Sequence, residues 1–339
     1  MTSGYVFTLT NAGSEKALKE EVAAFPQAWR PSYQRRGFIT FKSPSDDHPF
    51  TLRSLRTPPA FARRLCLSLG KVTSSAEALA LIGQSPAGSP AAGNPVIHHV
   101  RLTGGKMDRS DAEACPPPDP GQFVGTMVEL SPSEYWAGVH LHEPLLSPDP
   151  GGNGGLILPD DAPSRAWLKL EEAARFFGLR FSERDVVVEL GCAPGGVILA
   201  LLRRGVSCIG VDPAKLAPAV MEFALPALPE KPRARPWVVH CRKPAALVGK
   251  RDLGTQATWF MSDMNQSPAV AIKECGRFIR MCPAIRSALI TLKLTDLSQV
   301  ADKPLWLAAL RDMGFKTIRL QQLSVHNREL ALLGLDRQD

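Results

Sequence analysis

Four charged residues in the second half of the sequence have the types and order of a proton-transfer site: Lys169, Asp263, Lys293 and Glu329. An alcohol is a poor nucleophile at neutral pH unless a base takes its proton. A lysine can be that base when a second ammonium group and partial burial lower its pKa. We therefore predict that Lys293 is the general base and that Asp263 positions it. Lys169 and Glu329 would orient the hydroxyl and balance the charge.

A glycine-rich turn after a β-branched run predicts a cofactor site. Val186–Val188 reads as a buried strand that ends at Glu189, and Gly191-Cys-Ala-Pro-Gly-Gly196 follows. Glycines at such a bend let backbone N–H groups approach a ligand. A second strand over 207–211 ends at Asp212, where an acid of a βαβ unit holds a ribose. The spacing differs from GxGxxG, which favours S-adenosylmethionine over a dinucleotide.

A simpler interpretation exists for each of these residues. Taken alone, Lys169 or Lys293 is more often a solvated lysine, and Glu329 a surface acid. The turn alone could join a strand to a helix without binding anything. The order of all these residues around one glycine-rich turn favours the functional interpretation.

Alternating strands and helices are expected to position these residues. We predict strands over 186–189, 207–211, 237–241, 257–261 and 288–292, with helices over 164–177, 197–204, 269–281 and 302–313. This alternation is typical of a parallel sheet with helices on both faces, whose ligands bind at the carboxyl ends of the strands. Segments 315–320 and 330–335 would close the sheet as an antiparallel pair.

The first half of the chain predicts a smaller α+β region. Strands are expected over 5–9 and 37–41, a helix over 14–25, and a β pair over 123–130 and 135–141. Residues 85–95 read as a linker, and 144–155 as the connector at the main boundary. We predict three parts, 1–72, 73–150 and 151–339. Arg63 and Arg64 are expected to face solvent, with contact to RNA as the alternative.

Charge and cysteine content limit the classes of substrate, metal site and compartment that fit this chain. The 339 residues carry a net charge of +7; residues 1–158 hold 14 basic and 14 acidic residues, so the second half carries all of it. A basic half with a cofactor motif suggests a polyanionic substrate. Seven cysteines without a CxxC pair argue against a zinc site or a disulfide framework. Without a signal-type start or a long apolar run, we expect a cytoplasmic protein with no membrane span, and a monomer.

At these residues the chain resembles the FtsJ-type ribose 2′-O-methyltransferases, whose hallmark is a Lys-Asp-Lys-Glu tetrad. It is most similar to the bacterial 23S rRNA cytidine 2′-O-methyltransferases of the RlmM type. The segments that carry the resemblance are Pro159–Arg165, Leu168–Glu172, Glu189–Gly196, Ser262–Met264, Leu292–Leu294 and His326–Glu329.

The resemblance implies a class I, Rossmann-like methyltransferase domain that uses S-adenosylmethionine and acts on ribosomal RNA. It implies the catalytic tetrad Lys169, Asp263, Lys293 and Glu329. It implies cofactor contacts from Ala193, Pro194, Gly195, Gly196, Asp212 and Asp263. It also implies a ferredoxin-like unit at 1–72 and a reduced, THUMP-like RNA-binding region at 73–150.

Three positions depart from the family pattern. The acid expected after the third strand is missing, which leaves His240, Cys241 or a backbone group to contact the adenine. Val197 replaces an aromatic residue, and Ala166 replaces a hydroxyl side chain. The altered end of the third strand and Val197 leave open an RNA-binding or ribosome-assembly factor on a degenerate methyltransferase fold. A small-molecule methyltransferase is a third hypothesis.

Overall fold

A seven-stranded sheet forms the centre of the second half of the chain, in the order β13-β12-β11-β14-β15-β17-β16. Its strands are β11 (Val186–Leu190), β12 (Ser207–Val211), β13 (Val238–Cys241), β14 (Trp259–Ser262), β15 (Ser287–Lys293), β16 (Thr317–Gln321) and β17 (Glu329–Leu335). Strands β11 to β15 pair in parallel, and β17 pairs antiparallel with β15. The predicted methyltransferase-type α/β sheet is confirmed.

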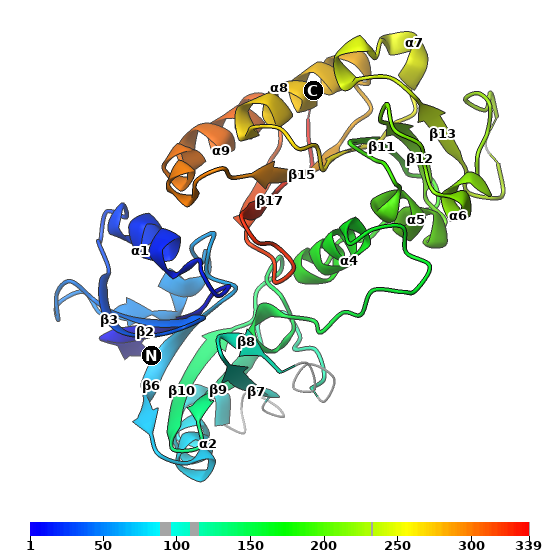
Figure 1. Ribbon diagram of the computed structural model, residues 1–339. Coiled ribbons are helices and arrows are strands. Elements are labelled where there is room, and N and C mark those ends of the chain that lie inside the picture. Colours follow the sequence, from blue (N-terminus) through cyan, green and yellow to red (C-terminus); the bar gives the residue numbers. More distant parts are fainter. Residues whose placement is uncertain (89–95, 109–114, 232, 339) are drawn as a thin grey trace. The chain divides into compact units, whose positions relative to one another are not determined.

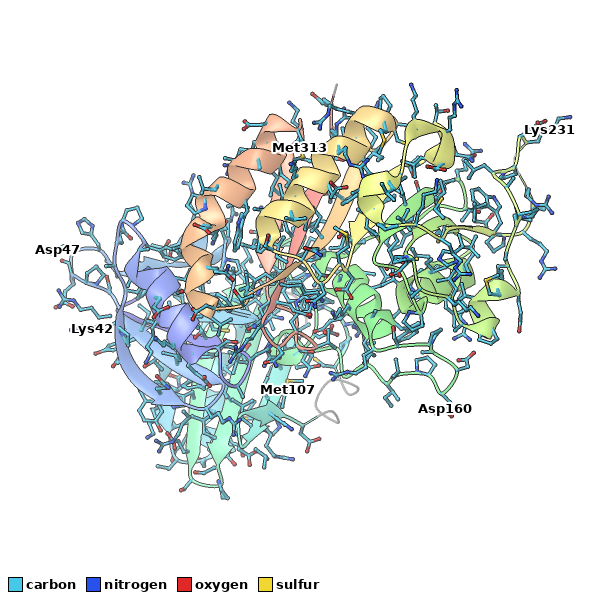
Figure 2. All side chains as sticks on the ribbon, turned by 45° about the horizontal axis from the view of Figure 1, so that its top comes forward. Lys42, Asp47, Met107, Asp160, Lys231 and Met313 are labelled. Carbon is cyan, nitrogen blue, oxygen red and sulfur yellow. The ribbon has the colours of Figure 1, made fainter. Side chains whose placement is uncertain are left out.

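Helices cover both faces of this sheet (Figure 1). They are α4 (Ala166–Phe177), α5 (Gly196–Arg203), α6 (Pro218–Met221), α7 (Lys250–Leu253), α8 (Pro268–Met281) and α9 (Lys303–Asp312). Helix α8 packs on β14 and β15, and Met313 after α9 packs against Gly276 of α8 (Figure 2). The β-branched and aliphatic side chains of the strands are buried between these layers, which makes a rigid base for the residues at the strand ends.

The computed structural model describes residues 1–88, 96–108, 115–231 and 233–338. The linker predicted over 85–95 lies mostly outside these residues. The chain divides into two units: unit 1 holds 1–155, 175–178 and 321–327, and unit 2 holds 156–174, 179–320 and 328–339. Among the described residues, no helix has the length and apolar character needed to cross a bilayer.

Unit 1 contains an eight-stranded sheet in the order β3-β4-β2-β6-β10-β9-β7-β8. The strands are β2 (Tyr5–Leu9), β3 (Arg30–Arg35), β4 (Phe38–Lys42), β6 (Arg64–Val72), β7 (Val96–Thr103), β8 (Lys106–Met107), β9 (Phe123–Ser131) and β10 (Glu134–Leu141). Helices α1 (Glu15–Ala23) and α2 (Ser75–Gly83) and the short pair β1 (Thr2–Ser3) and β5 (Phe50–Thr51) complete it. The predicted pairing of the segments now seen as β9 and β10 is confirmed.

Segments 1–72 and 73–150 share this sheet, because β6 pairs with β2 on one side and with β10 on the other. The ferredoxin-like and THUMP-like assignments stay predictions. Strand β3 was not expected from the sequence. It lies at the edge of the sheet, where Pro31, which has no N–H to donate, is tolerated.

Candidate active site

The four charged residues meet in unit 2 at the carboxyl edge of the parallel strands. Lys169 comes from α4, Asp263 directly follows β14, Lys293 ends β15 and Glu329 begins β17. Lys293 and Glu329 are register partners in the antiparallel pair β15–β17. Three adjacent strands and one helix thus fix the four side chains at one place.

The side chains alternate in charge and are in direct contact. Lys293 Nζ lies 2.6 Å from Asp263 Oδ1 and 2.5 Å from Glu329 Oε1. Lys169 Nζ lies 3.1 Å from both oxygens of Asp263 and 3.0 Å from Glu329 Oε2. Each side chain keeps between 15% and 19% of its surface exposed, so the cluster is sheltered but open to a reactant.

The predicted direction of the Lys293 pKa shift is wrong. Burial alone lowers it, but the negative charge of Asp263 and the hydrogen bonds to Asp263 and Glu329 outweigh burial, so the pKa lies above the ordinary lysine value. Two carboxylates at contact distance outweigh the burial that was expected to lower this pKa. In this state Lys293 is a protonated donor.

The glycine-rich turn connects β11 to α5 in a conformation that favours glycine. Gly191 and Gly195 have φ angles of 74° and 111°, and the Ala193–Pro194 peptide is cis. A Cβ on Gly191 would lie 3.0 Å from the backbone of Met264, and a Cβ on Gly196 would lie 2.4 Å from the Ser164 hydroxyl. These close approaches keep the turn against the ends of β14 and α4.

Two backbone amides hold the Asp212 carboxylate in place. Its Oδ2 accepts a hydrogen bond from the Ala193 amide at 3.2 Å, and its Oδ1 accepts one from the Ala214 amide at 2.8 Å. A carboxylate has about four acceptor positions. Two of them remain for the two hydroxyls of a ribose, so the residues present fit the nucleoside part of S-adenosylmethionine.

Glu189 also lies at the carboxyl edge of the parallel strands, and no role for it was predicted from the sequence. It lies on β11, between the strands that end at Asp212 and Asp263, and is 2% exposed. Its Oε2 is buried and has no hydrogen-bond partner among the described residues. Burial first, and then the charges of Asp263 and Asp212, raise the pKa of Glu189 well above its ordinary value. A cofactor that reaches from Asp212 to Asp263 must cross the end of β11.

The end of β13 lacks the acid that the family pattern has after the third strand. His240 Nε2 lies 3.0 Å from the Asp212 carbonyl oxygen, which can only accept, so Nε2 carries the proton. Burial lowers the pKa of His240, so the neutral ring offers Nδ1 as an acceptor at neutral pH. Lys243 and the Cys241 thiol are both bound by Asp252 of α7.

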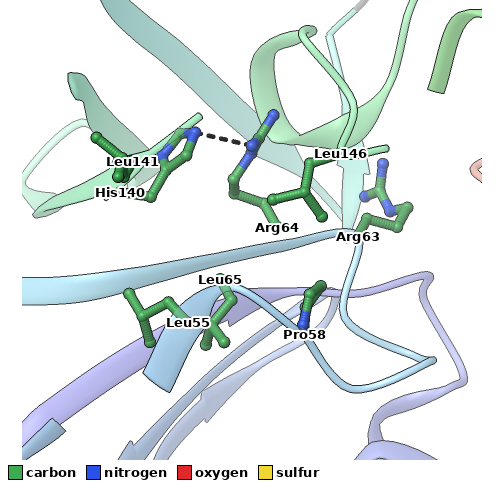
Figure 3. Close-up of a pocket in the computed structure, with 8 residues that line it drawn as sticks. All are labelled: Leu55, Pro58, Arg63, Arg64, Leu65, His140, Leu141 and Leu146. Carbon is green, nitrogen blue, oxygen red and sulfur yellow. Dashed lines mark hydrogen bonds between the residues drawn. The ribbon is translucent and has the colours of Figure 1, made fainter. Parts of the chain in front are cut away.

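Other positions named from the sequence are placed as follows. Val197 is buried, and Ala166 is half-buried, with its amide N–H donating a hydrogen bond to the Ser164 hydroxyl. Arg63 and Arg64, expected to face solvent or RNA, are 5% and 3% exposed in unit 1, so both alternatives are wrong. They line a small cavity there, where Arg64 contacts His140 (Figure 3).

Part of the second half of the chain is similar to a known family. Residues 162–278 match the model of the FtsJ-like methyltransferases. The "Ribosomal RNA large subunit methyltransferase M" of Histophilus somni is 44% identical over 73 residues, 20% of each chain. That of Tolumonas auensis is 28% identical over 65% of this chain and 59% of its own. That of Halorhodospira halophila is 27% identical over 86% and 83%. The first two alignments cover less than two thirds of those relatives.

Proposed function

We propose that this chain, whose residues 162–278 form an FtsJ-like methyltransferase domain, methylates a ribose 2′-hydroxyl of ribosomal RNA with S-adenosylmethionine. The observation that carries the proposal is the contact cluster of Lys169, Asp263, Lys293 and Glu329 beside the glycine-rich turn. The names of the relatives support ribosomal RNA as the substrate, and a cytidine of 23S rRNA is the finer proposal.

The proposed cofactor site consists of the turn residues Ala193, Pro194, Gly195 and Gly196, together with Asp212 and Asp263. When bound, S-adenosylmethionine supplies a methyl group on a positively charged sulfur. The Asp212 carboxylate would hold the ribose, and Gly195 and Gly196 would let the backbone approach the ligand. Asp263 would lie next to the methyl group, which explains why it serves both the cofactor and the tetrad.

Lys293 would act as the base after it gives up to solvent the proton that its carboxylate neighbours stabilise; 19% of its side chain is exposed. A positive charge in the adjacent cofactor site favours this loss, since like charges lower a lysine pKa. The neutral amine would then accept the 2′-hydroxyl proton as the oxygen takes the methyl group, and the S–CH3 bond would break to leave a neutral thioether. Lys169 keeps Asp263 and Glu329 in place, and alignment of the oxygen with the methyl group supplies much of the rate.

The test is methyl transfer from labelled S-adenosylmethionine to ribosomal RNA by the full chain. We expect Lys293→Ala to lower the rate by about 10²- to 10⁴-fold, the usual contribution of a general base. Lys273→Ala, an exposed position on α8, is the matched control and should retain the rate. Transfer by Lys293→Ala at the normal rate would refute the mechanism. Mapping 2′-O-methyl groups in rRNA with and without the gene identifies the nucleotide.

A second candidate is an RNA-binding or assembly factor on the same fold, with weak or no catalysis. The basic end of β13, where Arg242 and Lys243 follow His240 and Cys241, favours it, because the usual acid for the adenine is replaced. Calorimetry separates the two. Binding of S-adenosylmethionine below millimolar concentration supports the enzyme, and its absence supports the factor.

A further inference from the structure

Two partly exposed aromatic side chains lie together on one face of the sheet in unit 1. The ring centroids of Tyr33 on β3 and Trp136 on β10 are 5.4 Å apart, and Trp136 is 5.5 Å from Phe38. Both pack on the buried core of this face but keep part of their surface in solvent. Elsewhere the same face is covered, for example by Gly151 against Met107 and Leu9.

Two cations lie over the Tyr33 ring of this aromatic pair. The Arg35 guanidinium carbon lies 5.0 Å from the Tyr33 ring centroid, and Lys71 Nζ lies 4.9 Å from it. Arg30 and Arg36 are exposed on the same edge strand and its turn, and the segment 30–36 contains no acidic residue. Since residues 1–158 carry as many acids as bases, this concentration of positive charge is local.

One acid keeps the cluster ordered. Glu134 accepts a hydrogen bond from the Tyr33 hydroxyl and contacts Arg35 at 3.3 Å and Lys71 at 3.1 Å. Burial and Glu134 raise the pKa of Tyr33 to about 12, so the phenol stays uncharged. The side chains of Arg35 and Lys71 remain 56% and 47% exposed, so their remaining N–H groups can reach a second partner.

We propose that this Tyr33–Trp136 patch (Tyr33, Arg35, Lys71 and Trp136, with Arg30 and Arg36 on the same edge strand and its turn) binds one or two unpaired nucleotides of an RNA. Single-stranded RNA is recognised where aromatic side chains can stack with bases and nearby cations meet the phosphates. A duplex hides its base faces and fits the patch less well. The inference rests on the proposed function, which makes RNA the ligand. It adds a binding site in unit 1, whereas the four residues of the tetrad belong to unit 2.

The test is fluorescence anisotropy of a labelled single-stranded oligoribonucleotide with the full chain, repeated with the same strand in a duplex. We expect tighter binding of the single strand. Tyr33→Leu and Trp136→Leu should each weaken it about tenfold, within the range for loss of one stacked base. Phe181→Leu, which changes a half-buried aromatic residue in unit 2, and Lys16→Gln, at an exposed lysine of α1, are the controls.

Salt dependence separates RNA contact from a structural role. Arg35→Gln/Arg36→Gln should lower the slope of log affinity against log salt by about 1.4, because each single-strand phosphate contact contributes about 0.7. A patch that only holds β3 in place would change the melting temperature and leave this slope unchanged. Unchanged affinity and slope in all these variants, with the fold intact, would overturn the proposal.

Two further outcomes identify the cause of a failure. Asp263→Asn should abolish methyl transfer and retain RNA affinity. A failure of the tetrad proposal would therefore appear in the transfer rate, and a failure of the patch proposal in the RNA affinity. If an acidic peptide competes for the patch while RNA does not bind there, the partner is a protein and the proposal is wrong.

Discussion

Lys293 and Glu329 face each other across the antiparallel pair β15–β17, with Nζ 2.5 Å from Oε1. Strand pairing fixes this contact, because a one-residue slip would turn Glu329 to the other face of the sheet. The antiparallel strand therefore does more than close the sheet. It brings a carboxylate to the end of β15, where the parallel strands alone would leave Lys293 with Asp263.

Removing the charge of Glu329 should change the pH dependence of catalysis. In Glu329→Gln, Lys293 loses one of the carboxylates that keep its pKa high, so its pKa falls. We expect the limb on which the rate rises with pH to move to lower pH, because that limb follows deprotonation of Lys293, and we expect a lower maximal rate because Lys169 and Lys293 are less well held. Steady-state rates across pH measure both effects. An unshifted profile would show that Glu329 does not control the base.

Asp263→Asn should destabilise the protein as well as stop transfer. It leaves the Lys169 and Lys293 ammonium groups beside one carboxylate, and we expect a loss of about 2 kcal/mol of unfolding free energy, below the usual cost for a fully buried pair. Adding Lys293→Met should recover most of that loss without recovering activity. Chemical denaturation of the single and double variants is the measurement. A double variant no more stable than Asp263→Asn would contradict the charge argument.

The glycine-rich turn can be tested with two alanine substitutions. Gly191→Ala and Gly178→Ala both place a side chain at positive φ, which costs about 1 kcal/mol. At Gly178 the new Cβ meets open space, whereas at Gly191 it lies 3.0 Å from the Met264 backbone. We expect only Gly191→Ala to lose cofactor affinity, measured by calorimetry. Equal affinities in the two variants would mean that the close approach has no role in binding.

Part of the fold and of the site could be predicted from the sequence, and part could not. Val186–Val188 and the other apolar runs identified the parallel strands, since β-branched runs between helices have few alternatives. The basic segment over β3 has no apolar alternation, so this edge strand was missed. Because Arg63 and Arg64 are charged, their sequence predicts a position at the protein surface. In the structure, the backbone carbonyls of Ser147 and Asp149 accept hydrogen bonds from Arg64 and make its burial possible. The Lys293 pKa depended on contact distances that no sequence pattern contains.

Glu189 should make unit 2 less stable as pH rises. Burial and the acids Asp263 and Asp212 raise its folded pKa above the ordinary 4.5, so between these two values the folded state binds more protons than the unfolded state. The contribution is complete below the ordinary value and is lost as pH rises through the folded pKa. Glu189→Gln should remove this loss, with a gain in melting temperature that grows with pH. A gain independent of pH would contradict the assignment.

The buried histidines of unit 1 should give the opposite response to pH. Burial and then the charge of Arg64 hold the pKa of His98 and His140 well below the ordinary value, and lower the pKa of His142 to about 4. Below the ordinary 6.5 the unfolded chain binds more protons than the folded unit, so stability falls as pH falls, by up to about 1.4 kcal/mol per pH unit for each histidine. Amide hydrogen exchange at about pH 7 and about pH 5.5 should show unit 1 opening more often at the lower value, after correction for the intrinsic rate. His140→Asn should reduce that difference, whereas His48→Asn, at an exposed position, should leave it intact. Equal protection of β6, β9 and β10 at both pH values would show that these imidazoles do not set the acid stability of the sheet.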